Sequence, residues 1–149
     1  MPRVRDLLVR KSARGAPATI ASVGPDATVL EAARLMTARG IGGLLVLEGE
    51  QLVGIFTERD ILRRVVTEAR DPAATPVRAV MTSPVLAVSP DTPVAECRAL
   101  FTERRIRHLP VAGPNGLIGI VTSGDVLAFE SDEQRTTIEH LESYVYHGR

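Results

Sequence analysis

The sequence predicts an α/β (α+β) protein made of two β-α-β-β-α units in tandem, with a helix added at the C-terminus. Three observations support this fold class: an internal repeat, alternating strand and helix patterns within each copy, and the composition of a folded chain. Of the 149 residues, 44% are hydrophobic and 24% are charged, which is ordinary for a globular protein. A chain of this length is expected to form one domain or two small halves packed together.

The repeat is visible when the sequence is shifted by 65 residues, because residues 25–62 then align with residues 90–127 without a gap. Sixteen of the 38 aligned positions are identical. The short segments VRDLL at 4–8 and VRAVM at 77–81 also resemble each other. We therefore expect a first repeat at 1–69, a linker at 70–76, a second repeat at 77–128 and a C-terminal helical extension at 129–149.

Each copy shows the same order of hydrophobic patterns and stop signals. In the first copy we expect a strand at Ile20–Val23, a helix from the capping box Thr28-x-x-Glu31 to Gly40, and strands at Leu44–Leu47 and Leu52–Phe56. A second helix is expected from about Glu58, with Ile61, Leu62, Val65 and Val66 on one face. The second copy repeats this order, with Pro114-Asn115-Gly116 at its hairpin turn.

These shared motifs resemble the cystathionine-β-synthase (CBS) domain. The resemblance is carried by QLVGIFTERDI and GLIGIVTSGDV at the strand-to-helix junctions, by IRHLPV, and by the PDATV helix start, and it covers about residues 4–128. It implies two halves related by a pseudo-twofold axis with clefts between them, and modules that pair into a disk-like homodimer. It also implies a regulatory protein that binds an adenine nucleotide: AMP or ATP first, with ADP, NAD(H) or S-adenosylmethionine as alternatives.

The central motif is Thr-x-x-Asp, present as Thr57 with Asp60 and as Thr122 with Asp125. A carboxylate can accept hydrogen bonds from both ribose hydroxyls, and a threonine hydroxyl with the free N–H groups of a helix start suits a phosphate. The same spacing is a capping box that needs no ligand. The resemblance favours ribose binding by at least one copy.

Basic residues precede the strand of the second copy. A guanidinium matches phosphate geometry, so Arg107 or His108 is a candidate phosphate ligand, with an exposed loop charge as the alternative. The first copy has Gly42 and Gly43 there, and Arg59 could supply the missing charge.

An adenine ring needs an apolar slot. The resemblance places this slot along the short first strand and the strand before each junction, with ordinary core as the alternative. The residues selected are Thr19, Ile20 and Ile55 in the first half, and Val85, Leu86 and Ile120 in the second half. Pro110, on the strand that follows Arg107 and His108, is a further predicted nucleotide-binding residue.

The sequence shows no catalytic constellation and no metal-ligand spacing, so we expect neither an enzyme nor a metal protein. Lys plus Arg equals Asp plus Glu at 18 each, which argues against nucleic-acid or anionic-membrane binding. A cytoplasmic protein is expected, since no signal or membrane segment is recognisable. Cys97 is the single cysteine and is expected to be a buried small hydrophobe.

The C-terminal extension is acidic, whereas the N-terminus is basic. Ile138, Leu141 and Val145 form an apolar stripe at helical spacing. Two interpretations stay open: a helix docked on its own domain, or a helix that packs across a dimer or onto a client protein. Two functions also stay open: an adenine-nucleotide sensor, or a ligand-free interaction module that acts through its dimer surface and this helix.

Overall fold

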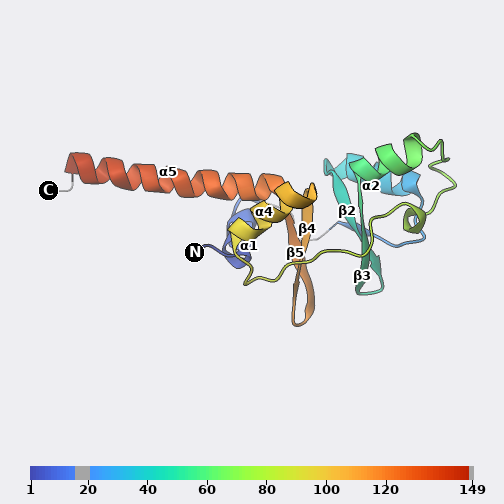
Figure 1. Cartoon of the computed structure of the whole chain (residues 1–149), viewed down its shortest axis with the longest axis horizontal. Helices are drawn as coiled ribbons and strands as arrows, with labels where there is room; N and C mark the ends of the chain where they lie inside the picture. Colours follow the sequence, from blue (N-terminus) through green and yellow to red (C-terminus); the bar gives the residue numbers. More distant parts are fainter. Residues whose placement is uncertain (16–20, 148–149) are drawn as a thin grey trace. The chain divides into compact units, whose positions relative to one another are not determined.

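The computed structural model describes residues 1–15 and 21–147, with side chains up to residue 142 (Figure 1). The described chain divides into two compact units. Unit 1 contains residues 1–15, 88–113 and 118–147, and unit 2 contains residues 21–87 and 114–117. The chain therefore starts in unit 1, builds unit 2, and then returns to complete unit 1.

Unit 2 is built on a three-stranded sheet of order β1-β2-β3. β1 (Ser22–Val23) runs parallel to β2 (Gly43–Glu48), and β2 forms an antiparallel hairpin with β3 (Gln51–Thr57). α2 (Val29–Arg39) packs beside the sheet. It starts at the expected capping box, in which the Glu31 N–H donates to Thr28 Oγ1 at 3.1 Å, and it ends at Gly40 with φ of 63°.

The helix after β3 differs from the sequence expectation. α3 (Glu58–Asp60) passes directly into a π-helical segment, η1 (Ile61–Val66). The wider turn rotates side chains away from the 3.6-residue period, so Val65 is buried whereas Leu62 and Val66 are 59% and 62% exposed. The four apolar residues that the sequence places on one face are therefore not buried alike.

Unit 1 contains α1 (Val4–Ala13), α4 (Val94–Arg104), and most of a hairpin of β4 (His108–Gly113) with β5 (Gly116–Thr122). The turn of this hairpin and the first two residues of β5 are grouped with unit 2. The short first strand expected for the second copy is reduced to a single parallel bridge between Val88 and Val111. The Val88 N–H donates to the Pro110 carbonyl at 2.9 Å, and the Ala112 N–H donates to the Val88 carbonyl at 2.8 Å.

The last helix, α5 (Ser123–His147), joins the second repeat to the C-terminal extension without a break. Its first turns pack against α1 and α4. Arg10 of α1 and Arg14, which directly follows α1, form ion pairs with Glu133 and Asp132 of α5. The basic N-terminal segment and the acidic C-terminal helix are therefore in contact. No helix in the described part of the chain is long and apolar enough to span a bilayer.

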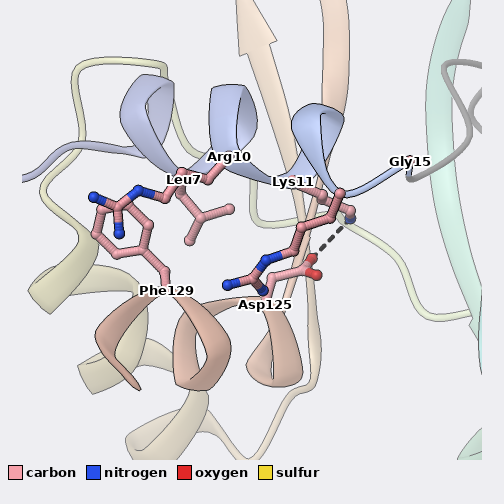
Figure 2. Close-up of a pocket in the computed structure, with 7 residues that line it drawn as sticks. Leu7, Arg10, Lys11, Gly15, Asp125 and Phe129 are labelled. Carbon is pink, nitrogen blue, oxygen red and sulfur yellow. Dashed lines mark hydrogen bonds and ion pairs between the residues drawn. The ribbon is translucent and has the colours of Figure 1, made fainter. Parts of the chain in front are cut away.

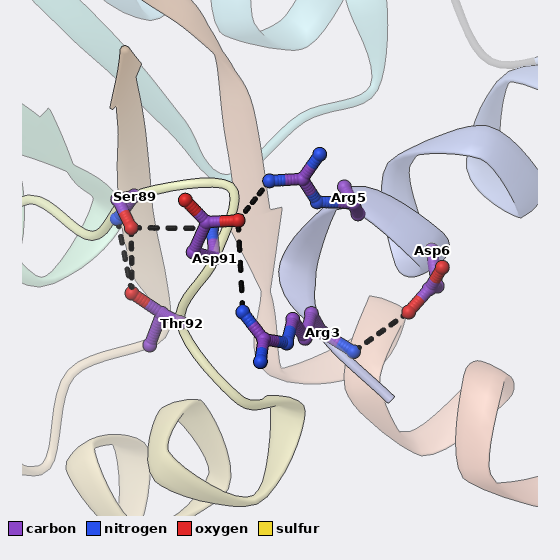
Figure 3. A network of polar contacts seen from close by, with 6 residues as sticks. All are labelled: Arg3, Arg5, Asp6, Ser89, Asp91 and Thr92. Atoms are coloured by element: carbon purple, nitrogen blue, oxygen red, sulfur yellow. Dashed lines mark hydrogen bonds and ion pairs between the residues drawn. The ribbon is translucent and has the colours of Figure 1, made fainter. Parts of the chain in front are cut away.

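The segment that precedes each repeat packs against the other repeat. In unit 1, the Val4 N–H donates to the Thr92 carbonyl at 2.8 Å, and the Val94 N–H donates to the Pro2 carbonyl at 3.0 Å. The Asp91 carboxylate forms an ion pair with Arg5, and its Oδ1 lies 3.7 Å from Arg3 Nη1 (Figure 3). The segment ahead of the first repeat is thereby fixed to the helix start of the second.

Unit 2 repeats these contacts with η2 (Val77–Ala79), the short 3-10 helix that leads the second repeat. The Val77 N–H donates to the Ala27 carbonyl at 2.8 Å, and the Val29 N–H donates to the Thr75 carbonyl at 2.9 Å. Arg78 forms an ion pair with Asp26. The division into compact units therefore crosses the repeat boundaries predicted at 1–69 and 77–128.

Each unit has its own hydrophobic core. The core of unit 1 is formed by Val4, Leu7, Val88, Val94, Cys97, Phe101, Leu109, Val111, Val121, Val126 and Phe129. The core of unit 2 is formed by Val29, Ala32, Met36, Leu44, Val46, Phe56, Val65, Val77 and Val80. Cys97 is fully buried, as expected, and this burial raises the pKa of its thiol.

Equivalent glycines of β3 and β5 provide a test of the core packing. A Cβ at Gly54 would lie 2.9 Å from Met81 Cγ and closer still to Met81 Sδ, whereas a Cβ at Gly119 would lie 3.4 Å from Leu8. We expect Gly54→Ala to lower the free energy of unfolding by about 1–3 kcal/mol through overpacking. Its matched control, Gly119→Ala, should change it little. Equal denaturation midpoints for both variants would contradict this account.

Candidate functional site

Both Thr-x-x-Asp motifs lie where a strand passes directly into a helix. In unit 2 the Glu58 N–H donates to the Gly42 carbonyl at 3.0 Å, and in unit 1 the Ser123 N–H donates to the Arg107 carbonyl at 3.0 Å. The residue that precedes each hairpin is therefore bound to the helix start, as the repeat alignment indicates. Arg107 accordingly lies next to the second junction, with an exposed side chain.

The Asp60 carboxylate has structural partners on both oxygens. Its Oδ2 accepts the Thr57 N–H at 3.0 Å, and its Oδ1 accepts the Thr82 hydroxyl at 2.9 Å. Arg64 Nε lies 3.9 Å from Oδ1. The side chain of Asp60 is only 7% exposed, so the first motif fits the capping-box interpretation.

The Asp125 carboxylate is more accessible, with 21% of its side chain exposed. Its Oδ2 accepts the Thr122 N–H at 2.9 Å and the Lys11 ammonium at 2.7 Å. The Asp125 N–H in turn donates to Thr122 Oγ1 at 3.1 Å. The second motif is thus also a capping box, but its carboxylate keeps an exposed part.

A pocket of about 250 Å³ borders Asp125, and Figure 2 shows it between α1 and the first turns of α5. Lys11 extends into it, and its ammonium also donates to the Ile120 carbonyl at 2.9 Å. The Arg10 guanidinium lies 4.7 Å from the centre of the Phe129 ring. The full lining is Leu7, Arg10, Lys11, Arg14, Gly15, Asp125 and Phe129.

Sequence reasoning missed the cations that α1 brings to this pocket. One feature of the sequence could have pointed to them: Lys11 is the single lysine in a chain whose other basic side chains, histidine apart, are all arginine. A second pocket of about 270 Å³ lies in unit 2 between α2 and the start of α3. Its only charged lining residue is Glu58, so it does not suit a phosphate. Among the residues that the structure describes, no cluster of His, Cys, Asp and Glu could hold a metal ion.

The other predicted site residues lie in several different settings. Ile55 is half-buried and exchanges two backbone hydrogen bonds with Thr82, at 3.0 and 2.8 Å. Pro110 is buried, His108 and Ile120 are half-buried, and Arg59 is exposed. Val85 and Leu86 belong to unit 2, whereas Ile120 and Asp125 belong to unit 1. Thr19 and Ile20 lie outside the described residues.

The structural role of Asp60 can be tested against an exposed neighbour. Asp60→Ala would leave the Thr82 hydroxyl and the Thr57 N–H without their acceptor, so we expect the free energy of unfolding to fall by about 1–3 kcal/mol. Glu58→Ala, at an exposed position two residues earlier, is the control and should have little effect. Chemical denaturation measures both, and an Asp60→Ala variant as stable as the parent would refute the role.

Comparison with known proteins gives the family. The model of the CBS domain family matches residues 4–67 and 77–132. The mitochondrial CBS domain-containing protein CBSX3 of Arabidopsis thaliana is 39% identical over 128 residues, which cover 83% of this chain but only 62% of that protein.

Solved structures agree with this assignment. A protein with CBS domains from Burkholderia ambifaria is 41% identical, with a TM-score of 0.79 over 85% of this chain and 91% of the other. CBSX2, solved in complex with AMP, is 26% identical, with a TM-score of 0.66 over 78% of this chain and 90% of the other. The chain belongs to the CBS domain family, with two copies of the domain in tandem.

Proposed function

We propose that this chain is a non-catalytic regulatory module that binds an adenine nucleotide at the Asp125 junction. The observation that carries the proposal is the exposed part of the Asp125 carboxylate, at the edge of a pocket that also holds Lys11, Arg10 and Arg14. In this arrangement Asp125 accepts hydrogen bonds from the ribose hydroxyls, while cations close by neutralise the phosphate. The AMP complex of CBSX2 supports AMP as the first ligand to test.

The proposed phosphate ligands are Arg107 and His108, which lie close to the N-terminal end of α5. Arg107 is bound through its carbonyl to the first residue of that helix, and a helix N-terminus favours an anion. The described pocket, at about 250 Å³, is smaller than the roughly 300–1,000 Å³ of sites for drug-sized ligands. It would therefore hold one part of a nucleotide. Ile120, Val85 and Leu86 stay predictions for contacts with the adenine, and Pro110 stays a predicted nucleotide-binding residue.

The first junction is proposed not to bind ribose. Both oxygens of Asp60 are already hydrogen-bonded and the residue is buried, so a ribose would have to replace internal bonds without a gain. Nucleotide binding at the first junction stays a prediction that neither described pocket supports; the residues concerned are Ile20, Ile55, Thr57 and Arg59. The module is proposed to have one functional nucleotide site.

The ligand is proposed to act by favouring one arrangement of a homodimer, which a client protein recognises. A ligand shifts such an equilibrium only if it binds the two arrangements with different affinity. The alternative is an interaction module without a ligand, supported by the capping-box role of both Thr-x-x-Asp motifs. A cytoplasmic location is part of the proposal, although the Arabidopsis relative is named as mitochondrial.

Thermal unfolding tests the ligand. Nucleotide-free protein is melted with AMP, ADP, ATP, NAD, NADH, S-adenosylmethionine or no addition. A ligand at 100 times its dissociation constant stabilises by ~2.7 kcal/mol, and each kcal/mol raises Tm by roughly 2–4 °C for a chain of this size. We expect a selective rise that Asp125→Ala abolishes and that Glu103→Ala, an exposed carboxylate of α4, preserves. No rise with any compound would favour the interaction module.

Arg107 separates phosphate recognition from nucleoside recognition. A hydrogen bond to a charged group contributes about 1.5–3 kcal/mol, so Arg107→Gln should weaken AMP binding by roughly ten-fold or more. Adenosine should bind the variant and the parent equally, since it carries no phosphate. Titration calorimetry with both compounds checks this, and an equal loss for AMP and adenosine would show that Arg107 does not read the phosphate.

A further inference from the structure

Residues 133–142 of α5 lie exposed, beyond the turns of the helix that pack against α1 and α4. The helix is held at its beginning by Arg98 with Glu130 at 2.8 Å, and by the ion pairs of Arg10 and Arg14 with Glu133 and Asp132. From residue 133 to residue 142 every position is exposed, and Figure 1 shows α5 running on beyond α1 and α4. The interpretation of a terminal helix docked on its own domain is therefore wrong for these residues.

This unpacked segment carries an apolar stripe. Ile138 and Leu141 are 55% and 60% exposed, and Leu127 on the same face is 73% exposed. Ile138 follows the buried Phe129 by nine residues, about two and a half helical turns, so the stripe faces away from α1. A helix segment without tertiary packing is marginal in water, and burial of this stripe against a partner would stabilise it.

The spacing of the stripe matches a helix-pairing seam. Positions 127, 131, 134, 138, 141 and 145 alternate between steps of four and three residues, which is the a/d pattern of paired helices. The second and third of these positions are the polar residues Ser131 and Gln134, and the other four are Leu127, Ile138, Leu141 and Val145. Apolar contact is therefore concentrated around Ile138 and Leu141.

The flanking charges indicate the partner. Arg135 and Glu142 lie on the same side of the stripe, seven residues apart. When a second copy of α5 runs antiparallel, with Ile138 facing Leu141 of that copy, Arg135 of each copy comes next to Glu142 of the other. In a parallel pair Arg135 would instead approach Glu130 of the second copy, and Glu130 is already bound to Arg98 within its own chain.

We propose that α5 pairs antiparallel with α5 of a second copy of this chain, through the Ile138 and Leu141 stripe and two Arg135–Glu142 contacts. An anionic membrane surface suits the segment poorly, because Glu139 and Glu142 lie beside the stripe. The pairing uses no residue of the nucleotide pocket. The argument for the pairing therefore does not rest on the proposed function.

Sedimentation velocity over a concentration series tests the pairing. We expect Ile138→Glu and Leu141→Glu each to halve the mass of the assembly, because a carboxylate would be buried in the seam. His140→Glu, an exposed position on the opposite side of the helix, is the matched control and should leave the mass unchanged. A parent chain that stays a monomer throughout, or a mass that Ile138→Glu does not change, would overturn the proposal.

Charge exchange tests the antiparallel direction. Arg135→Glu places two acids at each contact and Glu142→Arg places two bases there, so each variant alone should dissociate at lower concentration than the parent. Mixed together, the two variants should associate again, because every contact then joins an acid to a base. Failure of the mixture to associate would refute the antiparallel arrangement. Nucleotide binding by Ile138→Glu, measured in parallel, separates failure of this proposal from failure of the ligand proposal.

Discussion

The exchange of leading segments is the contact on which both compact units depend. Val4 and Val77 are fully buried, each in the core formed mainly by the other repeat. Burial of one valine side chain contributes about 1.5–3 kcal/mol, and the backbone hydrogen bonds around it fix the start of α2 or α4. Neither repeat can complete its own core from contiguous sequence. Each compact unit therefore needs residues from both repeats to complete its hydrophobic core.

The same exchange makes the two Thr-x-x-Asp junctions chemically different. The segment that leads the second repeat brings the Thr82 hydroxyl to Asp60, and the segment that leads the first repeat brings the Lys11 ammonium to Asp125. The short Thr82 side chain contacts the buried Asp60 directly, whereas the long Lys11 side chain reaches Asp125 along the lining of a pocket. Two nearly identical motifs therefore yield one buried cap and one accessible charged site.

Much of the fold could be predicted from the sequence, because repeated positions keep their roles. The capping box at Thr28, the helix end at Gly40 and the burial of Cys97 were confirmed. The π-helical turn of η1 could not be predicted, since its residues fit a regular helix equally well. The left-handed end of α4 is formed by Arg105 with φ of 52°, where the first copy has glycine, so packing overrides the local preference there. The cations of α1 were missed because the exchange that brings them to Asp125 joins residues more than a hundred positions apart.

Lys11 provides a physical route from the proposed ligand site to α5. The Lys11 ammonium donates to Asp125 Oδ2 and to the Ile120 carbonyl, so it lies beside the carboxylate that is proposed to bind the ribose. The neighbouring residues Arg10 and Arg14 attach the same helix to Glu133 and Asp132, at the point where α5 leaves its unit. A phosphate near these guanidinium groups would compete with the two carboxylates, although exposed ion pairs are individually weak. The proposed nucleotide site and the attachment of α5 therefore share neighbouring cations of one segment, and a phosphate bound there would weaken the ion pairs that hold the start of the proposed pairing helix.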